Sequence, residues 1–328
     1  MPVRKTTAVV SVLGLGALAL VGCSAAPQTA ESCGRVAVTD DALAGAEVSG
    51  EIGADLAVDL PASFRSAHAG HADVTTGDGA LIESMGQSAV LDVALVDPAT
   101  GVSLPVNASG GDETQVFPLS AFLDLMPGLE SSLECASEGS TFVASLGEKG
   151  FSDDFAQQAQ LAFAQQVMTE SGGGETPEVP DPESLVAVVE VHRVLPASAD
   201  GSPVYNAAFG MPSVVRDPDG VPGVTIPDAA APTEQTTQTL LQGDGEKVAE
   251  SDVVTLQYTS VGWATRAVTT STWQSGAPTT TTIDQLPPGF AEAITGAQVG
   301  SQILTVVPGS DGDATVSVID VLGTVPAA

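Results

Sequence analysis

The stretch Leu286-Pro287-Pro288-Gly289-Phe290, near the C-terminal end of the chain, follows the pattern of Leu125-Met126-Pro127-Gly128-Leu129, 161 residues earlier. The same offset separates Val299-Gly300-Ser301 from Glu138-Gly139-Ser140. In each copy a proline fixes the backbone φ angle for a helix start. The glycine of the second motif, Gly300 or Gly139, follows the helix in a turn. Two copies at a constant spacing predict two homologous domains, each with one short helix between strands.

Predicted strands flank this helix in both halves of the sequence. Each half has a Gly-Asp-Gly turn, then an alternating segment, and it closes with an apolar strand. The paired segments are residues 77–79 and 243–245, 88–94 and 253–258, and 184–195 and 315–322. Alternation with many β-branched residues is typical of strands, and the turn residues predict tight connections between them. In the second half, residues 290–295 complete the pattern as a helix of about two turns.

Length and charge limit the classes of function. The chain has 328 residues, with 41 Asp and Glu against 9 Lys and Arg, and a formal net charge of −32. This length favours two domains. The negative charge makes nucleic acid an improbable partner and argues against electrostatic adhesion to anionic lipid, so membrane attachment would have to be hydrophobic or covalent. Two small repeats also disfavour the solute-binding component of an importer, which would need two α/β lobes.

The N-terminal segment has the composition of an export signal. Arg4 and Lys5 precede an uncharged apolar stretch over residues 8–21, which is short for a membrane span, and Leu20-Val21-Gly22-Cys23 resembles the bacterial lipobox. The resemblance implies cleavage before Cys23, acylation of that cysteine, and attachment at the extracytoplasmic face of the cell membrane. Residues 1–22 are then the signal peptide and residues 23–46 a stalk. The alternative is an ordinary secretory signal with a chance cysteine.

Two further cysteines remain once Cys23 carries lipid. An even pair in an exported chain suggests a disulfide between Cys33 and Cys135, which would close a loop of about 100 residues. Two unpaired thiols are the alternative.

Two other segments depart from the repeat. The first half contains an insertion over residues 147–182. Its acidic start and its many Ala and Gln residues predict a helix over 153–168. The candidate apolar contacts of this helix are Phe155, Leu161, Phe163 and Val167. Between the halves, residues 196–232 are rich in Pro, Gly and Asp, which favours a linker with short extended pieces.

Histidines are few, and they do not form a metal-binding motif. His68 and His71 have a spacing that would suit half of a metal site. The third histidine, His192, is far from these two in sequence and lies in a predicted strand, so it does not complete a motif with them. We therefore expect His68 and His71 to occupy a flexible exposed loop. We assign no metal ligands and no cofactor.

The second half, residues 233–328, resembles an FKBP-type peptidyl-prolyl cis-trans isomerase domain. Family members have a Gly-Asp-Gly turn, a strand ending Tyr-Thr-Gly, a Phe-Asp-Ser-Ser segment, a Gly-x-Pro turn, a Val-Ile-x-Gly-Trp helix start and a Val-Gly turn. The corresponding residues are Gly243-Asp244-Gly245, Tyr258-Thr259-Ser260, Val268-Thr269-Thr270-Ser271, Gly276-Ala277-Pro278, Leu286-Pro287-Pro288-Gly289-Phe290 and Val299-Gly300. Residues 47–195 read as a degenerate copy, and the arrangement resembles actinobacterial lipoproteins with tandem domains of this kind.

The resemblance implies an α+β fold with two FKBP-like domains, each a curved antiparallel sheet around a short helix. It also implies a pocket in the second domain, with Tyr258 and Phe290 as its catalytic residues. The other substrate-binding positions implied by the resemblance are Val268, Thr269, Thr281, Leu286, Pro287 and Ser317. Several of these replace aromatic or acidic residues of the family, and Pro287 lacks the backbone N–H that normally anchors ligands.

The function implied is isomerisation of X–Pro bonds in exported polypeptides by a lipid-anchored protein. The reaction needs no metal, and we expect a monomer whose partners are proline-containing chains. The alternative is a lipoprotein that has kept the fold as a binding or chaperone module without catalysis. In the first half, Val93 and Leu129 stand at the positions of the pocket tyrosine and tryptophan, which favours a non-catalytic domain.

We expect Cys23→Ser to release the protein into the medium, because the substitution removes the thiol that would carry the acyl chains. Immunoblots of cell and medium fractions measure the distribution. Retention of the serine variant on cells, at the level of the unsubstituted protein, would contradict the lipid anchor.

Overall fold

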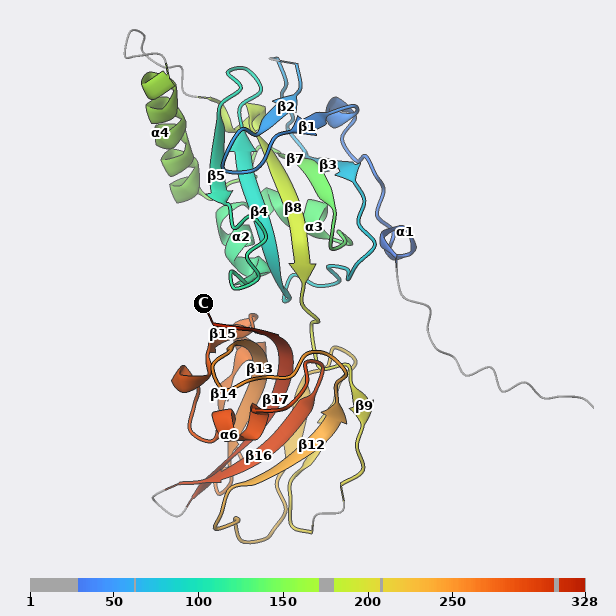
Figure 1. Ribbon diagram of the computed structural model, residues 1–328, viewed down its shortest axis with the longest axis vertical. Helices are drawn as coiled ribbons and strands as arrows, with labels where there is room; N and C mark the ends of the chain where they lie inside the picture. Colours follow the sequence, from blue (N-terminus) through green and yellow to red (C-terminus); the bar gives the residue numbers. More distant parts are fainter. Residues whose placement is uncertain (1–28, 62, 171–179, 207–208, 310–312, 328) are drawn as a thin grey trace, which may run out of the picture.

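Two antiparallel sheets are stacked end to end along the long axis of the molecule (Figure 1). The computed structural model describes residues 29–61, 63–170, 180–206, 209–309 and 313–327. The expected signal peptide, Cys23 and the first part of the expected stalk lie outside these residues. Among the helices described, none has the length and apolar character needed to cross a membrane.

The sheet of the N-terminal domain has five strands in the order β3-β7-β8-β4-β5, and a short strand, β6, pairs with the start of β4. Every pairing is antiparallel. The strands are β3 (Ala69–Thr75), β4 (Ser88–Val96), β5 (Ser103–Asn107), β6 (Phe117–Pro118), β7 (Thr141–Leu146) and β8 (Val186–Val194).

The sheet of the C-terminal domain repeats this order as β12-β16-β17-β13-β14, with β9 added beside β12 and β15 paired with β13. All of its pairings are antiparallel. The strands are β9 (Ser202–Pro203), β12 (Thr236–Gln242), β13 (Val253–Gly262), β14 (Val268–Ser271), β15 (Thr279–Thr282), β16 (Gln302–Pro308) and β17 (Ala314–Val325). The predicted fold class, α+β with a curved antiparallel sheet and a short helix in each of two domains, is confirmed.

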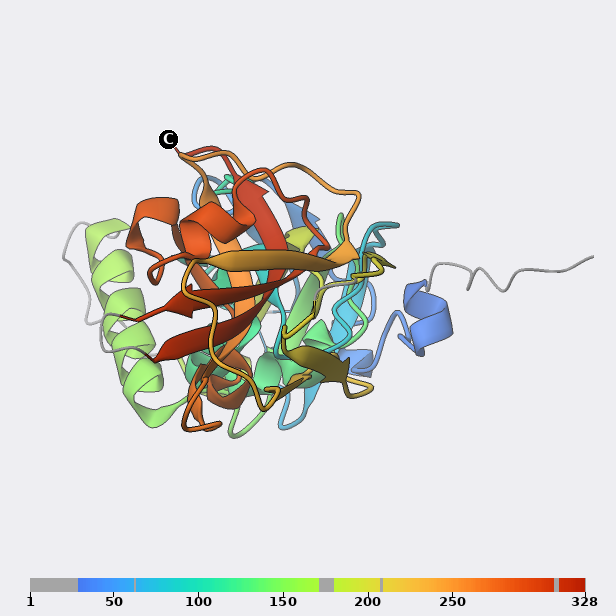
Figure 2. The same ribbon diagram turned by 90° about the horizontal axis from the view of Figure 1, so that it is seen from below.

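Most helices lie on one side of each sheet, which the view from below shows for the C-terminal domain (Figure 2). In the N-terminal domain, the helical turn that carries Leu43 lies on the other side. The helices of the N-terminal part are α1 (Ala30–Cys33), η1 (Asp41–Leu43), α2 (Leu119–Leu125), η2 (Pro127–Leu129), α3 (Glu130–Leu133), α4 (Asp153–Glu170) and η3 (Pro182–Ser184). The C-terminal domain has α5 (Thr272–Ser275), η4 (Ile283–Gln285) and α6 (Phe290–Ile294). The helix predicted from the 290–295 pattern is therefore present as α6, although it is shorter.

The helix predicted within the insertion is confirmed as α4, and it stands beside β5 (Figure 1). Phe163 is buried in the main core of the N-terminal domain, while Phe155 and Val167 pack against that core. The predicted apolar contact of Leu161 is wrong, because this residue is 64% exposed. One face of a helix can dock on a domain, and the periodicity of this helix is too weak to show which face does so.

Parts of the expected stalk and linker belong to the domains. Leu43 is buried on the face of the N-terminal sheet opposite α2 and α3, and Arg35 pairs with Asp73 through a contact of 2.6 Å.

In the linker, β10 (Ser213–Arg216) and β11 (Pro222–Thr225) form a hairpin, and Ile226 packs with Trp263 on the outer face of the C-terminal sheet. Another hairpin, β1 (Glu47–Ser49) with β2 (Ala57–Asp59), belongs to the N-terminal domain. Both outer faces are apolar, so they are stable only when covered.

His71 corrects the expectation of a flexible exposed loop. Although His68 is exposed, His71 lies in β3 with 3% of its surface exposed. One ring nitrogen lies 3.0 Å from the Val36 carbonyl oxygen and the other 3.3 Å from the Thr39 hydroxyl. Burial, together with the charge of Arg35, lowers the pKa of His71. The histidine is a core residue that ties the N-terminal segment to the sheet.

A disulfide joins Cys33 to Cys135, with 5.8 Å between their Cα atoms and a sequence separation of 102. It fastens the N-terminal segment beside α3. We expect reduction to lower the free energy of unfolding by about 4–5 kcal/mol, because the bridge restricts a long loop in the unfolded chain. Urea denaturation of the oxidised and reduced proteins measures the difference. A double serine variant that unfolds at the midpoint of the oxidised protein would contradict a stabilising bridge.

Candidate functional site

A cavity of about 330 Å³ opens on the helix-bearing side of the C-terminal sheet. Strands β13 and β14 form one wall, and the residues at the start of α6 form another. The end of β16 and the beginning of β17 complete the lining. The lining residues are Tyr258, Ser260, Thr269, Thr270, Pro287, Pro288, Phe290, Val307, Pro308, Gly309, Thr315 and Ser317. The accessible lining surface is mainly apolar, with hydroxyl groups placed around it.

Two aromatic rings line this cavity side by side. The rings of Tyr258 and Phe290 meet edge to face, with centroids 5.1 Å apart and planes at 86°. This is a favourable aromatic geometry, and it fixes the orientation of the tyrosine. Phe290 is 2% exposed and belongs to the core beneath α6, whereas Tyr258 is half-buried. Within the described chain, no residue is hydrogen-bonded to the Tyr258 hydroxyl, so this group can donate to a ligand.

Gly289 allows α6 to approach the sheet closely. Its φ angle is 82°, in the left-handed region that glycine adopts without strain, and a Cβ atom there would lie 2.4 Å from Cγ2 of Val307. The Gln235 amide nitrogen donates to the Gly289 carbonyl at 2.8 Å. The glycine therefore positions Phe290, the first residue of α6, beneath the cavity.

Two serine hydroxyls on neighbouring strands, β13 and β17, form a polar part of the cavity lining. The side chains of Ser260 and Ser317 are hydrogen-bonded to each other at 2.8 Å, and both residues are buried. Sequence analysis missed Ser260. The signal that would have found it is the alternation of β13, because Ser260 is two residues beyond Tyr258 and so faces the same side of the sheet.

Five of the eight pocket positions implied by the resemblance line this one cavity. They are Tyr258, Thr269, Pro287, Phe290 and Ser317. They come from β13, β14, the start of α6 and β17, segments that lie far apart in the sequence.

The other three positions lie outside the cavity lining. Val268 is 48% exposed on β14, because a β-bulge at this point turns Thr269 and Thr270 toward the cavity and leaves Val268 beyond it. Thr281 pairs with Val254, well before Tyr258 on β13, and its hydroxyl donates to Gln285 at 3.3 Å. Leu286 packs into the core beneath α6.

The corresponding place in the N-terminal domain is filled. Val93 and Leu129, at the positions of Tyr258 and Phe290, are fully buried in one apolar cluster. Phe163 of α4 belongs to the same cluster and is 1% exposed. The insertion helix therefore contributes a side chain to the core that contains both residues.

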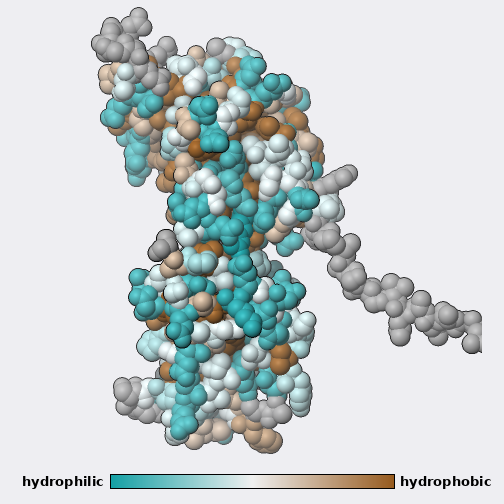
Figure 3. Space-filling model, in the orientation of Figure 1, coloured by the Kyte–Doolittle hydropathy of each residue, from teal (hydrophilic) through white to brown (hydrophobic). Residues whose placement is uncertain are grey.

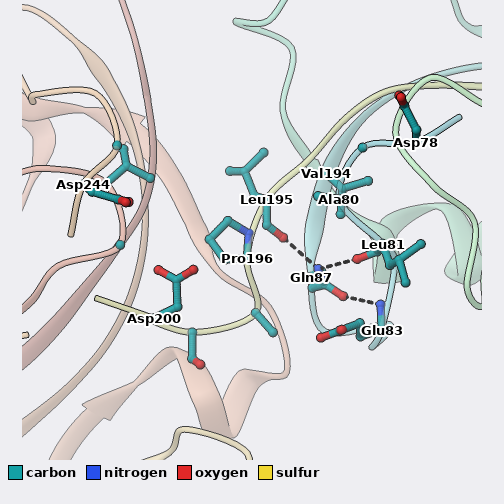
Figure 4. A pocket seen from close by; sticks show the side chains of 16 residues that line it. Asp78, Ala80, Leu81, Glu83, Gln87, Val194, Leu195, Pro196, Asp200 and Asp244 are labelled. Carbon is teal, nitrogen blue, oxygen red and sulfur yellow. Dashed lines mark hydrogen bonds between the residues drawn. The ribbon is translucent and has the colours of Figure 1, made fainter. Parts of the chain in front are cut away.

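A larger cavity, of about 620 Å³, lies between the two domains (Figure 4). The two Gly-Asp-Gly turns face it with Asp78 and Asp244, and Glu83 and Asp200 add further carboxylates. The surface around this junction is hydrophilic (Figure 3). A prolyl ring is apolar and gains little from carboxylates, so the smaller cavity beside Tyr258 is the candidate site.

Comparisons with known proteins give only distant structural matches. No family model matches the chain. No curated protein matches it. Solved structures that resemble it include FKBP12 from Mycobacterium tuberculosis, with 21% identity, a TM-score of 0.24, and coverage of 29% of this chain and 86% of that chain.

Two further structures have similar scores. FkpA from Escherichia coli has 19% identity and a TM-score of 0.28 over 37% of this chain and 55% of that chain. The 3 FKBP domains of wheat FKBP73 have 12% identity and a TM-score of 0.31 over 79% of this chain and 95% of that chain. With identities this low and TM-scores below 0.5, the matches by themselves assign neither a family nor an activity.

We expect Gly289→Ala to destabilise the C-terminal domain more than Gly296→Ala. Both glycines have φ near 82°, so each substitution incurs the left-handed conformational cost of about 1–2 kcal/mol. A Cβ at Gly296 meets nothing within 4 Å, whereas one at Gly289 overlaps Val307. Overpacking should add about 1–3 kcal/mol to the loss. Urea denaturation measures both variants, and equal losses would contradict the close approach of α6.

Proposed function

We propose that the C-terminal domain binds proline-containing segments of polypeptides in the cavity lined by Tyr258 and Phe290 and catalyses cis-trans isomerisation of the X–Pro bond. The observation that supports this most directly is a mainly apolar cavity lined by an edge-to-face aromatic pair with an available hydroxyl. A volume of about 330 Å³ is at the lower end for small-ligand sites, which suits a prolyl ring with its neighbouring amide.

The geometry suits this reaction because the reaction requires no nucleophile, acid or base. Resonance holds the X–Pro amide planar behind a rotation barrier of about 18–20 kcal/mol, while the cis and trans forms differ by only about 0.5–1 kcal/mol. An apolar site favours the twisted amide, which has lost resonance and part of its dipole. The Tyr258 hydroxyl would donate to a substrate carbonyl, and Phe290 would support the prolyl ring.

Export and a lipid anchor are part of the same proposal. The Leu20-Val21-Gly22-Cys23 motif supports them, and the Cys33–Cys135 disulfide is consistent with an oxidising compartment outside the cytoplasm. The substrates would then be polypeptides that fold at the extracytoplasmic face of the cell membrane, and the protein would act there as a monomer.

Binding without catalysis is the second candidate function. Pro287 lines the cavity and has no backbone N–H to hold a substrate carbonyl. Thr269 supplies a hydroxyl where the family has a carboxylate. A cavity with these changes can still hold a prolyl ring while doing less to stabilise the twisted amide.

We expect Tyr258→Ala to lower kcat/KM for a proline tetrapeptide by at least about tenfold, because it removes both the hydroxyl and the aromatic wall. Tyr258→Phe should lower it by about two- to tenfold, the loss of one hydrogen bond of about 0.5–1.5 kcal/mol. A protease-coupled isomerisation assay measures these rates.

Tyr205→Phe is the matched control. Tyr205 is the other tyrosine of the chain and is 91% exposed outside the cavity, so its substitution should leave the rate unchanged. If the unsubstituted protein binds the peptide without isomerising it, and Tyr258→Ala weakens this binding, then the binding function holds and the enzymatic one does not. Isomerisation that is insensitive to Tyr258 would contradict the assignment of the site.

A further inference from the structure

Two carboxylates oppose each other on neighbouring strands of the N-terminal sheet. Asp92 of β4 and Glu190 of β8 are direct cross-strand partners in the antiparallel register. His192, two residues beyond Glu190 on β8, points to the same face. Like charges in directly opposite positions are destabilising, and a cation between them would remove that repulsion.

The three side chains converge on a small volume. Nε2 of His192 lies 3.1 Å from Oδ2 of Asp92 and 3.8 Å from Oε2 of Glu190, and one ligand atom from each residue lies within 4.8 Å of the others. Ligand atoms around a tetrahedral zinc ion, with bonds of about 2.0–2.2 Å, have similar separations. The imidazole and the Glu190 carboxylate are 29% and 27% exposed, which leaves room for a water ligand.

Asp92 is held in place by its own hydrogen bonds. Its Oδ1 accepts the backbone N–H of Ser109 at 2.6 Å and the Ser109 hydroxyl at 2.5 Å, and its Oδ2 accepts the backbone N–H of Gly110 at 2.8 Å. Oδ2 also lies 3.1 Å from Nε2 of His192, so it faces the other side chains of the cluster. Such supporting contacts are typical of residues that bind metals, since they fix the ligand orientation.

The local charge also favours a cation. Burial raises the pKa of Glu190, and Asp92 and Glu51 raise it further, while His192 opposes this. Burial alone would raise the pKa of Asp92, but hydrogen bonds from Ser109, His192 and Gly110 lower it, so this carboxylate stays ionised. The cluster therefore combines a carboxylate held by backbone hydrogen bonds with a second carboxylate directly opposite it on the neighbouring strand.

We propose that Asp92, Glu190 and His192 bind one Zn²⁺ ion, with water as the fourth ligand. The proton on Nε2 of His192 would leave to solvent or be replaced by one on Nδ1, and the metal would take the position between Nε2 and Oδ2. A mixed nitrogen and oxygen set of this size fits zinc better than calcium, which takes six to eight oxygen ligands. The ion would join β4 to β8 beside the loop of Ser109 and Gly110.

The test uses Zn²⁺ alone and the full chain, freed of metal with a chelator. Isothermal titration should show one site that is stronger than the many weak carboxylate sites of an acidic chain, and zinc should raise the thermal midpoint. Glu190→Gln and His192→Gln should each weaken this site by at least about tenfold. Metal-free melting curves show whether either variant is folded.

His68→Gln is the matched control, because His68 is an exposed histidine of the same domain outside the cluster. It should leave the zinc affinity unchanged. Cobalt in place of zinc gives a second readout, since tetrahedral coordination changes its visible absorption and His192→Gln should abolish that change. A zinc isotherm that is the same in Glu190→Gln, His192→Gln and the unsubstituted chain would overturn the proposal, as would an isotherm with only weak, multiple sites.

Discussion

The helix-bearing face of each sheet must be covered by apolar side chains, and the way it is covered decides what each domain can bind. In the C-terminal domain the cover is α6, a helix of five residues. Its Phe290 and Ile294 bury the neighbouring parts of β13, β16 and β17. Beyond them the face stays open beside Tyr258. The candidate site is thus the part of the sheet that stays uncovered beside the start of this short helix.

The N-terminal domain meets the same requirement with more helix. Three helical segments follow one another from Leu119 to Leu133, and α4 of the insertion adds Phe163 to the same core. Its strand order matches that of the C-terminal domain, so the two sheets present equivalent faces. At the two positions equivalent to Tyr258 and Phe290, the N-terminal domain has the fully buried aliphatic side chains of Val93 and Leu129.

Each sheet also has an outer apolar face, on the side away from the main helices. The need to cover this face explains why parts of the expected stalk and linker are structured. Leu43 covers one outer face, and Ile226 with Trp263 covers the other. At the edge of the outer face of the N-terminal sheet, polar groups replace the apolar side chains that cover the rest. There the backbone N–H groups of Ser109 and Gly110 donate to the Asp92 carboxylate. A cross-strand carboxylate pair at such a margin is partly shielded from water, so its repulsion is stronger than on an open surface.

The sequence by itself determined the features that depend on near neighbours: the alternation of the strands, the acidic start of α4, the repeated Pro-Gly helix starts and the cysteines available for pairing. Only the tertiary structure decided that Thr269 lines the cavity while the adjacent Val268 does not, because a bulge in the pairing of β13 with β14 separates them. It also decided that His71 is buried and that Asp92 faces Glu190. Strand register and helix docking depend on contacts between distant segments, and no local pattern records them.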